Sequence, residues 1–188
     1  EFAPAELERV RQMQLARIRQ EGTQPQAIAL RELPPLMYGK DHPYGVPFTG
    51  SGTTDGVKSV TRDDLVAFHR RWIRPDNASV FVVGDTSLAA LLPLLEARFG
   101  SWTAPAEPLP VKRFPAVTPP AAKVVLIDRP GAPQSLILAG YPLGAKGTDD
   151  ALALYAANDI VGGSFTSRLN ADLREAKGWA YGVSTSIN

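Results

Sequence analysis

The sequence predicts an α+β protein in which helices pack on mainly antiparallel sheets. Apolar side chains recur at helical spacing in several stretches, most clearly at Leu65, Phe68 and Trp72. Short runs rich in Val, Ile and Leu, such as residues 78–84, are typical of strands. A proline-rich stretch at residues 101–122 separates two groups of such elements.

Helical patterns account for about half of the expected elements. Thr61 and Asp64 have the spacing of a capping box, with Asp in the place of Glu, and predict the start of one helix. Ser164 or Thr166 is expected to cap the last helix, and Gly178 suits a left-handed stop after it. The expected helices cover residues 4–20, 25–37, 61–72, 88–99, 149–161 and about 166–176.

Strands and a linker complete the expected organisation. The strands are expected at residues 78–84, 123–128, 134–141 and 179–187. Six prolines in residues 101–122 predict an extended linker, because proline fixes φ and removes a backbone donor. We therefore expect residues 1–100 to end one domain and residues 123–188 to begin the next, in a fragment of a longer protein.

The composition excludes several classes of function. Twenty basic and 19 acidic residues give a net charge of +1 without a basic stripe, so no nucleic acid is expected as a partner. No apolar run approaches the length of about 18 residues that a membrane span needs. The absence of cysteine excludes disulfides, cysteine-ligated zinc and thiol nucleophiles within these residues.

The histidines do not predict a metal site. A catalytic zinc ion needs about three protein ligands and an open position. His42 and His69 are the two histidines of the sequence, and they lie far apart along the chain. We expect His42 to form local hydrogen bonds in a loop and His69 to pack on its helix.

Several spaced motifs carry a family resemblance. Gly-Gly-Ser-Phe-Thr-Ser-Arg-Leu begins at Gly162, and Leu-Arg-Glu-Ala-Lys-Gly-Trp-Ala-Tyr ends at Tyr181. His-Pro-Tyr-Gly at residues 42–45 and the patterns over residues 61–85 and 91–102 precede them in the same order. Together they resemble the pitrilysin/insulinase family of zinc metallopeptidases, whose half-domains have the mitochondrial-processing-peptidase type of fold.

The resemblance implies a half without zinc. The inverted His-x-x-Glu-His motif of the family is missing from this sequence. The helix at residues 6–19 resembles the one that bears a further Glu ligand, and Arg17 stands at that position. Because a guanidinium cannot serve as an ordinary zinc ligand, we expect no metal here and zinc in the catalytic half. Three nearby carboxylates could replace the missing ligand: Glu6, Glu8 and Glu21.

The resemblance also implies a pair of substrate-binding residues. In family members the half without zinc often supplies an Arg and a Tyr seven residues apart, a separation that Arg174 and Tyr181 have. Arg174 would donate hydrogen bonds to substrate carbonyls, and Tyr181 would donate to the oxyanion. Alternatively, Arg174 is a solvated helix residue and Tyr181 a core aromatic. Arg168 could have a structural role by pairing with Asp172.

The functional hypothesis follows from this resemblance. The parent protein would hydrolyse peptide bonds with zinc held by another half or subunit, and this segment, inactive alone, would line the chamber and position the peptide substrate. The alternatives are a non-enzymatic scaffold subunit of the same fold and an unrelated peptide-binding module. A bacterial periplasmic or envelope location fits relatives of this kind.

Overall fold

The computed structural model describes residues 2–143 and 150–187. Their contacts divide the chain into two compact units, one ending at Pro142 and the other beginning at Leu143. The expected division into domains at 1–100 and 123–188, with a linker between them, concerns a longer protein and stays a prediction.

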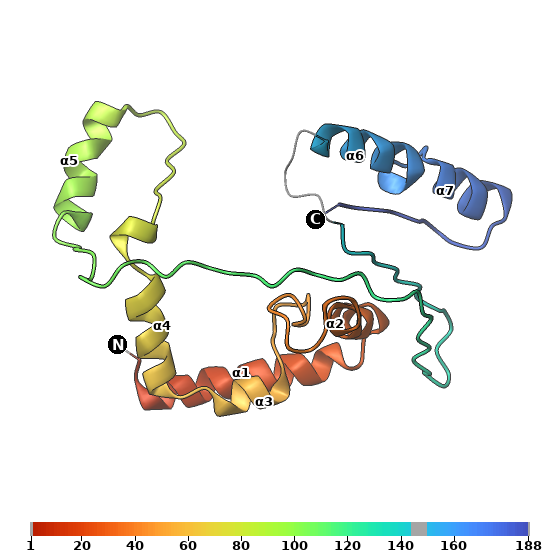
Figure 1. Ribbon diagram of the computed structural model, residues 1–188, viewed down its shortest axis with the longest axis horizontal. Coiled ribbons are helices and arrows are strands. Elements are labelled where there is room, and N and C mark those ends of the chain that lie inside the picture. The colour runs from red at the N-terminus through yellow and green to blue at the C-terminus, as the bar shows by residue number, and fades with distance from the viewer. Residues whose placement is uncertain (1, 144–149, 188) are drawn as a thin grey trace. The chain divides into compact units, whose positions relative to one another are not determined.

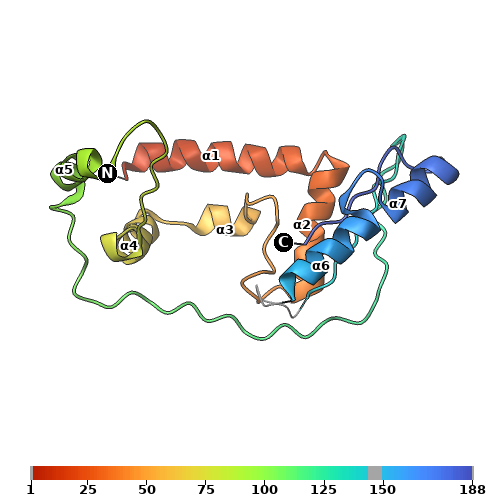
Figure 2. The same cartoon turned by 90° about the horizontal axis from the view of Figure 1, so that it is seen from above.

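The first unit contains the longest helices, and α3 packs against α1 (Figures 1 and 2). The helices expected near residues 4, 25, 61 and 88 are confirmed. The helix α3 was not expected, because it begins inside a glycine-rich loop. The elements are α1 (Pro4–Glu21), α2 (Pro25–Tyr38), α3 (Thr54–Ser59), α4 (Arg62–Trp72), the 3₁₀ turn η1 (Pro75–Asn77) and α5 (Leu88–Phe99).

Short polar side chains begin α3 and α4. The Thr61 hydroxyl accepts from the Asp64 backbone N–H at 3.2 Å, and the Asp64 carboxylate accepts from the Thr61 N–H at 2.8 Å. This is the predicted capping box, and the hydrogen bonds from Thr61 lower the pKa of Asp64. The Thr53 hydroxyl accepts from the Gly56 N–H at 3.0 Å and caps α3 in the same way. Local capping therefore outweighs the glycine content of the loop before Ser59.

The second unit consists of short helical segments and a C-terminal extended segment. The elements are α6 (Ala151–Asn158), the π-helical turn η2 (Asp159–Gly163), α7 (Arg168–Asn170) and the π-helical turn η3 (Ala171–Ala176). Residue 149, where the first of these helices was expected to begin, lies outside the described residues. Ser167 precedes α7, so the expected cap at Ser164 or Thr166 is wrong. Gly178 has φ 62°, which confirms the expected left-handed stop.

The predicted α+β class with antiparallel sheets is wrong for the part of the chain that the structure describes. Its regular elements are helical, and residues 78–84, 123–128, 134–141 and 179–187 form no strands there. Val83 and Val124 are almost fully exposed in these segments. A pattern of apolar residues favours an extended backbone, but a strand also needs a neighbour that pairs with its N–H and C=O groups. Within the described residues, no neighbouring strand pairs with these segments.

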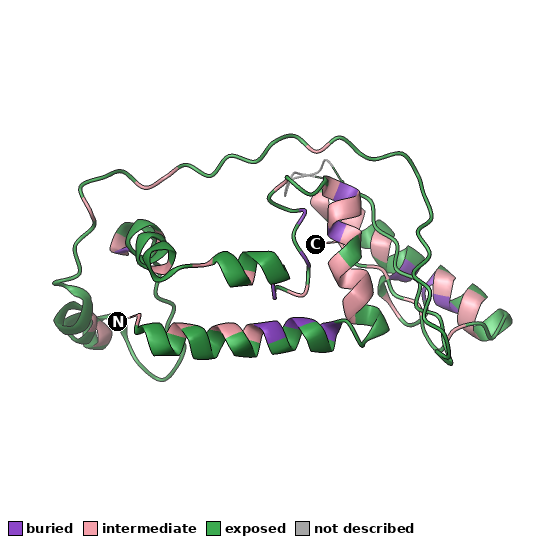
Figure 3. Ribbon diagram, turned by 90° about the horizontal axis from the view of Figure 1, so that it is seen from below, coloured by how far each residue is buried: buried purple, intermediate pink, exposed green. Residues whose placement is uncertain are grey.

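Buried residues lie in the second half of α1, in the second half of α2 and in the loop before α3 (Figure 3). The buried apolar residues among those described are Leu15 and Ile18 of α1, and Pro34 and Met37 of α2. Gly140 lies beside α2, and a Cβ at this position would come within 2.6 Å of the Met37 sulfur. The 134–141 segment therefore approaches the end of α2 closely.

The proline-rich stretch is fixed to the rest of the first unit at two places. Arg74, which is buried, forms a bidentate pair with Asp76 at 2.6 and 2.8 Å and donates to the Glu107 carbonyl at 2.9 Å. Further along, the rings of Tyr44 and Phe114 stack with centroids 5.0 Å apart. The stretch is thus held at Glu107 and at Phe114, while the residues between are mostly exposed.

We expect Arg74→Ala to increase the rate at which trypsin cleaves after Lys112 and Arg113 several-fold, because the carbonyls of the stretch lose their common donor. Gel or mass-spectrometric time courses measure this rate. Arg70→Ala is the matched control, since Arg70 reaches Glu107 only through an exposed ion pair of 3.3 Å. Equal cleavage of the two variants would contradict the anchoring role of Arg74.

Candidate functional site

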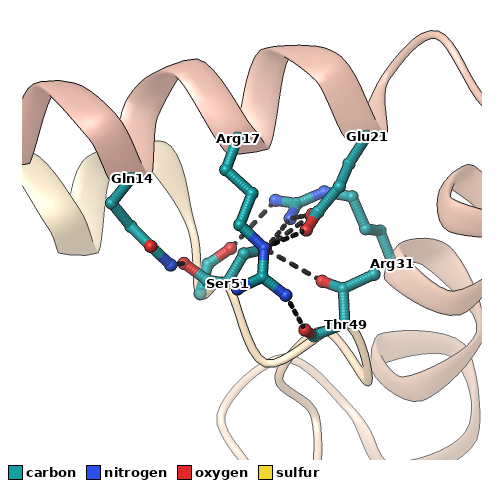
Figure 4. A network of polar contacts seen from close by, with 7 residues as sticks. Gln14, Arg17, Glu21, Arg31, Thr49 and Ser51 are labelled. Carbon is teal, nitrogen blue, oxygen red and sulfur yellow. Dashed lines mark hydrogen bonds and ion pairs between the residues drawn. The ribbon is translucent and has the colours of Figure 1, made fainter.

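A buried carboxylate lies at the end of α1, close to the predicted position of the missing metal ligand (Figure 4). The Glu21 carboxylate accepts from the Ser51 hydroxyl at 2.6 Å, from Arg31 Nη1 at 2.8 Å and from Arg17 Nε at 3.2 Å. Arg31 also donates to the Gly52 carbonyl at 3.0 Å. The cluster joins α1, α2 and the glycine-rich loop through one acid.

The surroundings of Glu21 favour its charged form. Burial raises the pKa of Glu21, but hydrogen bonds from Ser51, Arg31, Thr49 and Arg17 together outweigh that effect and lower it below 4.5. A carboxylate with this set of donors has its lone pairs occupied. Glu21 therefore acts as a structural anion in α1.

The residues considered as zinc ligands do not fit a metal centre. Glu6 pairs with Arg9 at 2.8 Å and Glu8 with Arg11 at 3.0 Å, so both carboxylates already face cations. No group of three or more His, Cys, Asp or Glu residues that could hold a metal ion occurs in residues 2–143 and 150–187. Arg17, which the resemblance aligned with the family ligand, pairs with the Glu21 carboxylate at 3.2 Å.

Each histidine contacts backbone groups or an aromatic ring, and neither belongs to a group of potential metal ligands among the described residues. His42 Nδ1 accepts from the Tyr44 N–H at 3.0 Å, and its Nε2 lies 3.1 Å from the Pro115 carbonyl. The local hydrogen bond expected for His42 is therefore present. His69 contacts the Phe2 ring edge-on, with the ring centroids 5.7 Å apart.

The structure brings the two predicted substrate-binding residues together in the second unit. Arg174 lies in η3, and its guanidinium carbon is 5.7 Å from the centre of the Tyr181 ring. The same carbon lies closer to the Phe165 ring, at 4.3 Å from its centre. The guanidinium thus has aromatic neighbours from two different segments of the chain.

The Arg174 cation is held without hydrogen bonds to described residues. Its Nη1 atom is buried and has no hydrogen-bond partner there, although the Glu175 carboxylate lies 3.5 Å away. The Arg174 side chain is 28% exposed, while Tyr181 is 96% exposed. Arg174 is therefore more buried than a solvated helix residue, and Tyr181 is not a core aromatic in the second unit.

Two asparagines fix the segment that carries Tyr181. Asn170, which is buried, donates to the Val183 carbonyl at 2.7 Å and accepts from the Val183 N–H at 3.0 Å. Asn158 donates to the Thr185 carbonyl at 3.2 Å. Gly162 allows Thr185 to approach the backbone of η2 closely, since a Cβ at Gly162 would come within 2.6 Å of the Thr185 hydroxyl.

Sequence reasoning missed some of the residues that build this site. It did not single out Phe165 or Asn170, although both lie inside the motif that begins at Gly162. The expected pair of Arg168 with Asp172 is wrong, because the Asp172 carboxylate pairs with Lys177 at 2.8 Å. Sequence spacing alone does not distinguish these two partners, since both lie near Asp172 along the chain.

Comparison with protein families decides the classification. The family model described as the peptidase M16 inactive domain matches residues 59–188. The chain belongs to the peptidase M16 inactive-domain family. This confirms the expected relationship to zinc metallopeptidases and to their inactive half. An inactive domain also agrees with described residues that contain no group of three or more potential metal ligands.

Relatives of this M16 chain are described as zinc proteases. An uncharacterized zinc protease of Mycobacterium tuberculosis is 28% identical over 149 residues, which are 79% of this chain and 33% of that protein. Zinc protease PqqE of Helicobacter pylori is 28% identical over 139 residues, which are 72% of this chain and 30% of that protein. The chain thus spans about a third of the length of these relatives.

A solved structure agrees with the fold of the M16 chain. A crystal structure of the peptidase M16 inactive domain from Pseudomonas fluorescens matches 99% of this chain and 44% of that chain. The TM-score is 0.73 at 20% sequence identity. At this identity the likeness concerns the fold alone. Separately, no helix among the described residues is long and apolar enough to cross a membrane.

We expect Glu21→Gln to lower the free energy of unfolding of the M16 chain by about 2 kcal/mol at pH 7, because it leaves Arg31 part-buried without its counter-ion. The folded-state pKa of Glu21 is lowered, so its contribution is present above the ordinary pKa of 4.5 and is lost as the pH falls through the folded value. Thermal unfolding by circular dichroism at several pH values measures both effects.

The pH dependence of the unfolding free energy distinguishes a stabilising charge on Glu21 from simple packing of its side chain. Below pH 4.5 the difference between the wild type and Glu21→Gln should shrink. Glu6→Gln is the control, because Glu6 forms only an exposed ion pair with Arg9. A difference that stays constant down to pH 3 would show that the Glu21 charge has no part in stability.

We expect Asn170→Ala to release the segment that carries Tyr181, with a loss of about 2 kcal/mol, because both backbone groups of Val183 lose their partner. Amide hydrogen exchange at residues 181–187 measures the release. Asn158→Ala removes one donor to the Thr185 carbonyl and should have a smaller effect. Exchange at the wild-type rate in Asn170→Ala would rule out this anchoring.

Proposed function

We propose that this chain is the substrate-positioning, non-catalytic part of a zinc endopeptidase, in which Arg174 and Tyr181 contact the peptide. The observation that carries the proposal is the state of Arg174. Its guanidinium is held near two rings, and its Nη1 has no hydrogen-bond partner among the described residues. Because Nη1 itself is buried, the donors proposed to meet a ligand are those on the exposed part of the side chain, which is 28% exposed.

The chemistry of Arg174 suits a peptide backbone. A guanidinium presents five N–H donors in a fixed plane, which match carbonyl and carboxylate oxygens. The aromatic neighbours restrict the long side chain, so binding a peptide costs less rotamer entropy than it would with a free arginine. We propose that Arg174 binds carbonyl groups of an extended substrate.

Tyr181 supplies a different group. Its side chain is 96% exposed, and a phenol hydroxyl can donate a hydrogen bond. A neutral donor that faces a developing oxyanion stabilises the tetrahedral intermediate more than the substrate. We propose this role for the Tyr181 hydroxyl, which would give it a larger effect on kcat than on KM.

Zinc would be held by another half or subunit of the parent protein. The donors considered in this chain do not fit the metal, and relatives three times as long as the matched segment are described as zinc proteases. A peptide substrate and a zinc-bearing half are therefore the proposed partners. The alternative, a scaffold subunit of the same fold, would have no need of free donors on Arg174.

In the full parent protein with its zinc-bearing part, we expect Arg174→Ala to lower kcat/KM for an extended peptide about tenfold, mainly through KM. Tyr181→Phe should lower kcat by roughly a hundredfold or more, because it removes one oxyanion donor. Steady-state cleavage of a fluorogenic peptide measures both constants.

Arg168→Ala is the matched control for Arg174, because Arg168 is an exposed arginine at the start of α7 in the same unit. Its kinetic constants should equal those of the wild type. If Arg174→Ala and Tyr181→Phe both leave kcat/KM unchanged in an active parent protein, substrate positioning is refuted. A parent protein without peptidase activity would favour the scaffold alternative.

A further inference from the structure

The Phe165 ring is the closest aromatic neighbour of the Arg174 guanidinium. The guanidinium carbon lies 4.3 Å from the Phe165 ring centre and 5.7 Å from the Tyr181 ring centre. Attraction between a cation and the face of a ring falls off beyond about 6 Å. Phe165 therefore makes the stronger of the two contacts.

No hydrogen bond to a described residue competes with the Phe165 contact in holding Arg174. An arginine side chain has many rotamers, and hydrogen bonds usually select one of them. The Nη1 atom of Arg174 is buried without such a bond, and the Glu175 carboxylate at 3.5 Å lies on the adjacent residue. The direction of the guanidinium thus depends on the rings, because ring faces attract the cation and leave its N–H donors free.

The backbone holds Phe165 in place although its side chain is 69% exposed. The turn that contains it is closed by a hydrogen bond from the Ser167 N–H to the Ser164 carbonyl, at 3.1 Å. The Asn170 amide also donates to the Ser164 carbonyl at 3.2 Å. Asn170 is the residue that fixes Val183, so one buried amide fixes the segments of both rings.

We propose that Phe165 is a positioning residue that holds the Arg174 guanidinium toward the peptide without contacting the reacting atoms. This inference rests on the proposed role of Arg174 in substrate binding. This exposed phenylalanine, two residues after a Gly-Gly pair, then has a specific role. It fixes the Arg174 guanidinium in direction and leaves the N–H donors of that group free for the substrate.

The test is steady-state peptide cleavage by the full parent protein with its zinc-bearing part. Phe165→Leu, which keeps an apolar side chain and removes the ring, should raise KM about 2- to 5-fold with little change in kcat. Phe165→Tyr keeps the ring face and should retain the wild-type KM. Tyr155→Leu is the control, because Tyr155 is a half-exposed aromatic residue of α6 in the same unit.

A double-mutant cycle that combines Phe165→Leu with Arg174→Ala shows whether Phe165 affects KM through Arg174. In the Arg174→Ala background, Phe165→Leu should change KM no further. An equal rise of KM in both backgrounds would mean that Phe165 acts independently of Arg174, and would overturn the inference. A failure of Phe165→Tyr to retain the wild-type KM would also overturn it.

The kinetics also separate this inference from the proposed function. If Arg174→Ala raises KM but Phe165→Leu does not, only the role of Phe165 is refuted. If Arg174→Ala has no effect, both fail. Because Phe165 is largely exposed, Phe165→Leu should fold, and its melting temperature, compared with that of the wild type, checks this directly.

Discussion

Arginine side chains that reach from one segment to another hold the first unit together. Arg31 joins α2 to Glu21 of α1 and to the Gly52 carbonyl, and Arg74 joins η1 to the Glu107 carbonyl. Arg11 donates to the Lys58 and Val60 carbonyls at the end of α3. A planar cation with five donors can satisfy several acceptors at once. This matters because few apolar residues are buried among those described, so that hydrogen-bonded ion pairs help to determine how the segments meet.

Arg174 of the second unit is held in another way. Arg11, Arg31 and Arg74 use their donors on carboxylates and carbonyls, whereas Arg174 lies near the rings of Phe165 and Tyr181. Ring faces attract the positive charge as a whole and occupy none of the N–H groups. A cation fixed in this manner is restricted in direction and still available for binding. That difference separates an arginine suited to a ligand from the arginines that stabilise the fold.

The helices could be predicted because their signals are local. The capping box at Thr61 and Asp64 and the glycine stop at Gly178 depend on residues within about one helical turn of each other. The strands could not be predicted in the same way. Residues 123–128 and 134–141 have the right side chains, but pairing depends on a neighbour far along the chain. For the candidate site, the resemblance singled out Arg174 and Tyr181 by their spacing, whereas the contact of Phe165 with Arg174 has no signal in the sequence.

The sequence by itself determined the family, most of the helix boundaries in the first unit and the lack of a histidine-based zinc motif, because each depends on residue types and their spacing. Only the tertiary structure decided the partner of Glu21, the pairing of Asp172 with Lys177 and the contact of Phe165 with Arg174. Long side chains can reach several partners that the sequence places equally near. The backbone path, fixed by Asn170 in the second unit, selects one of them.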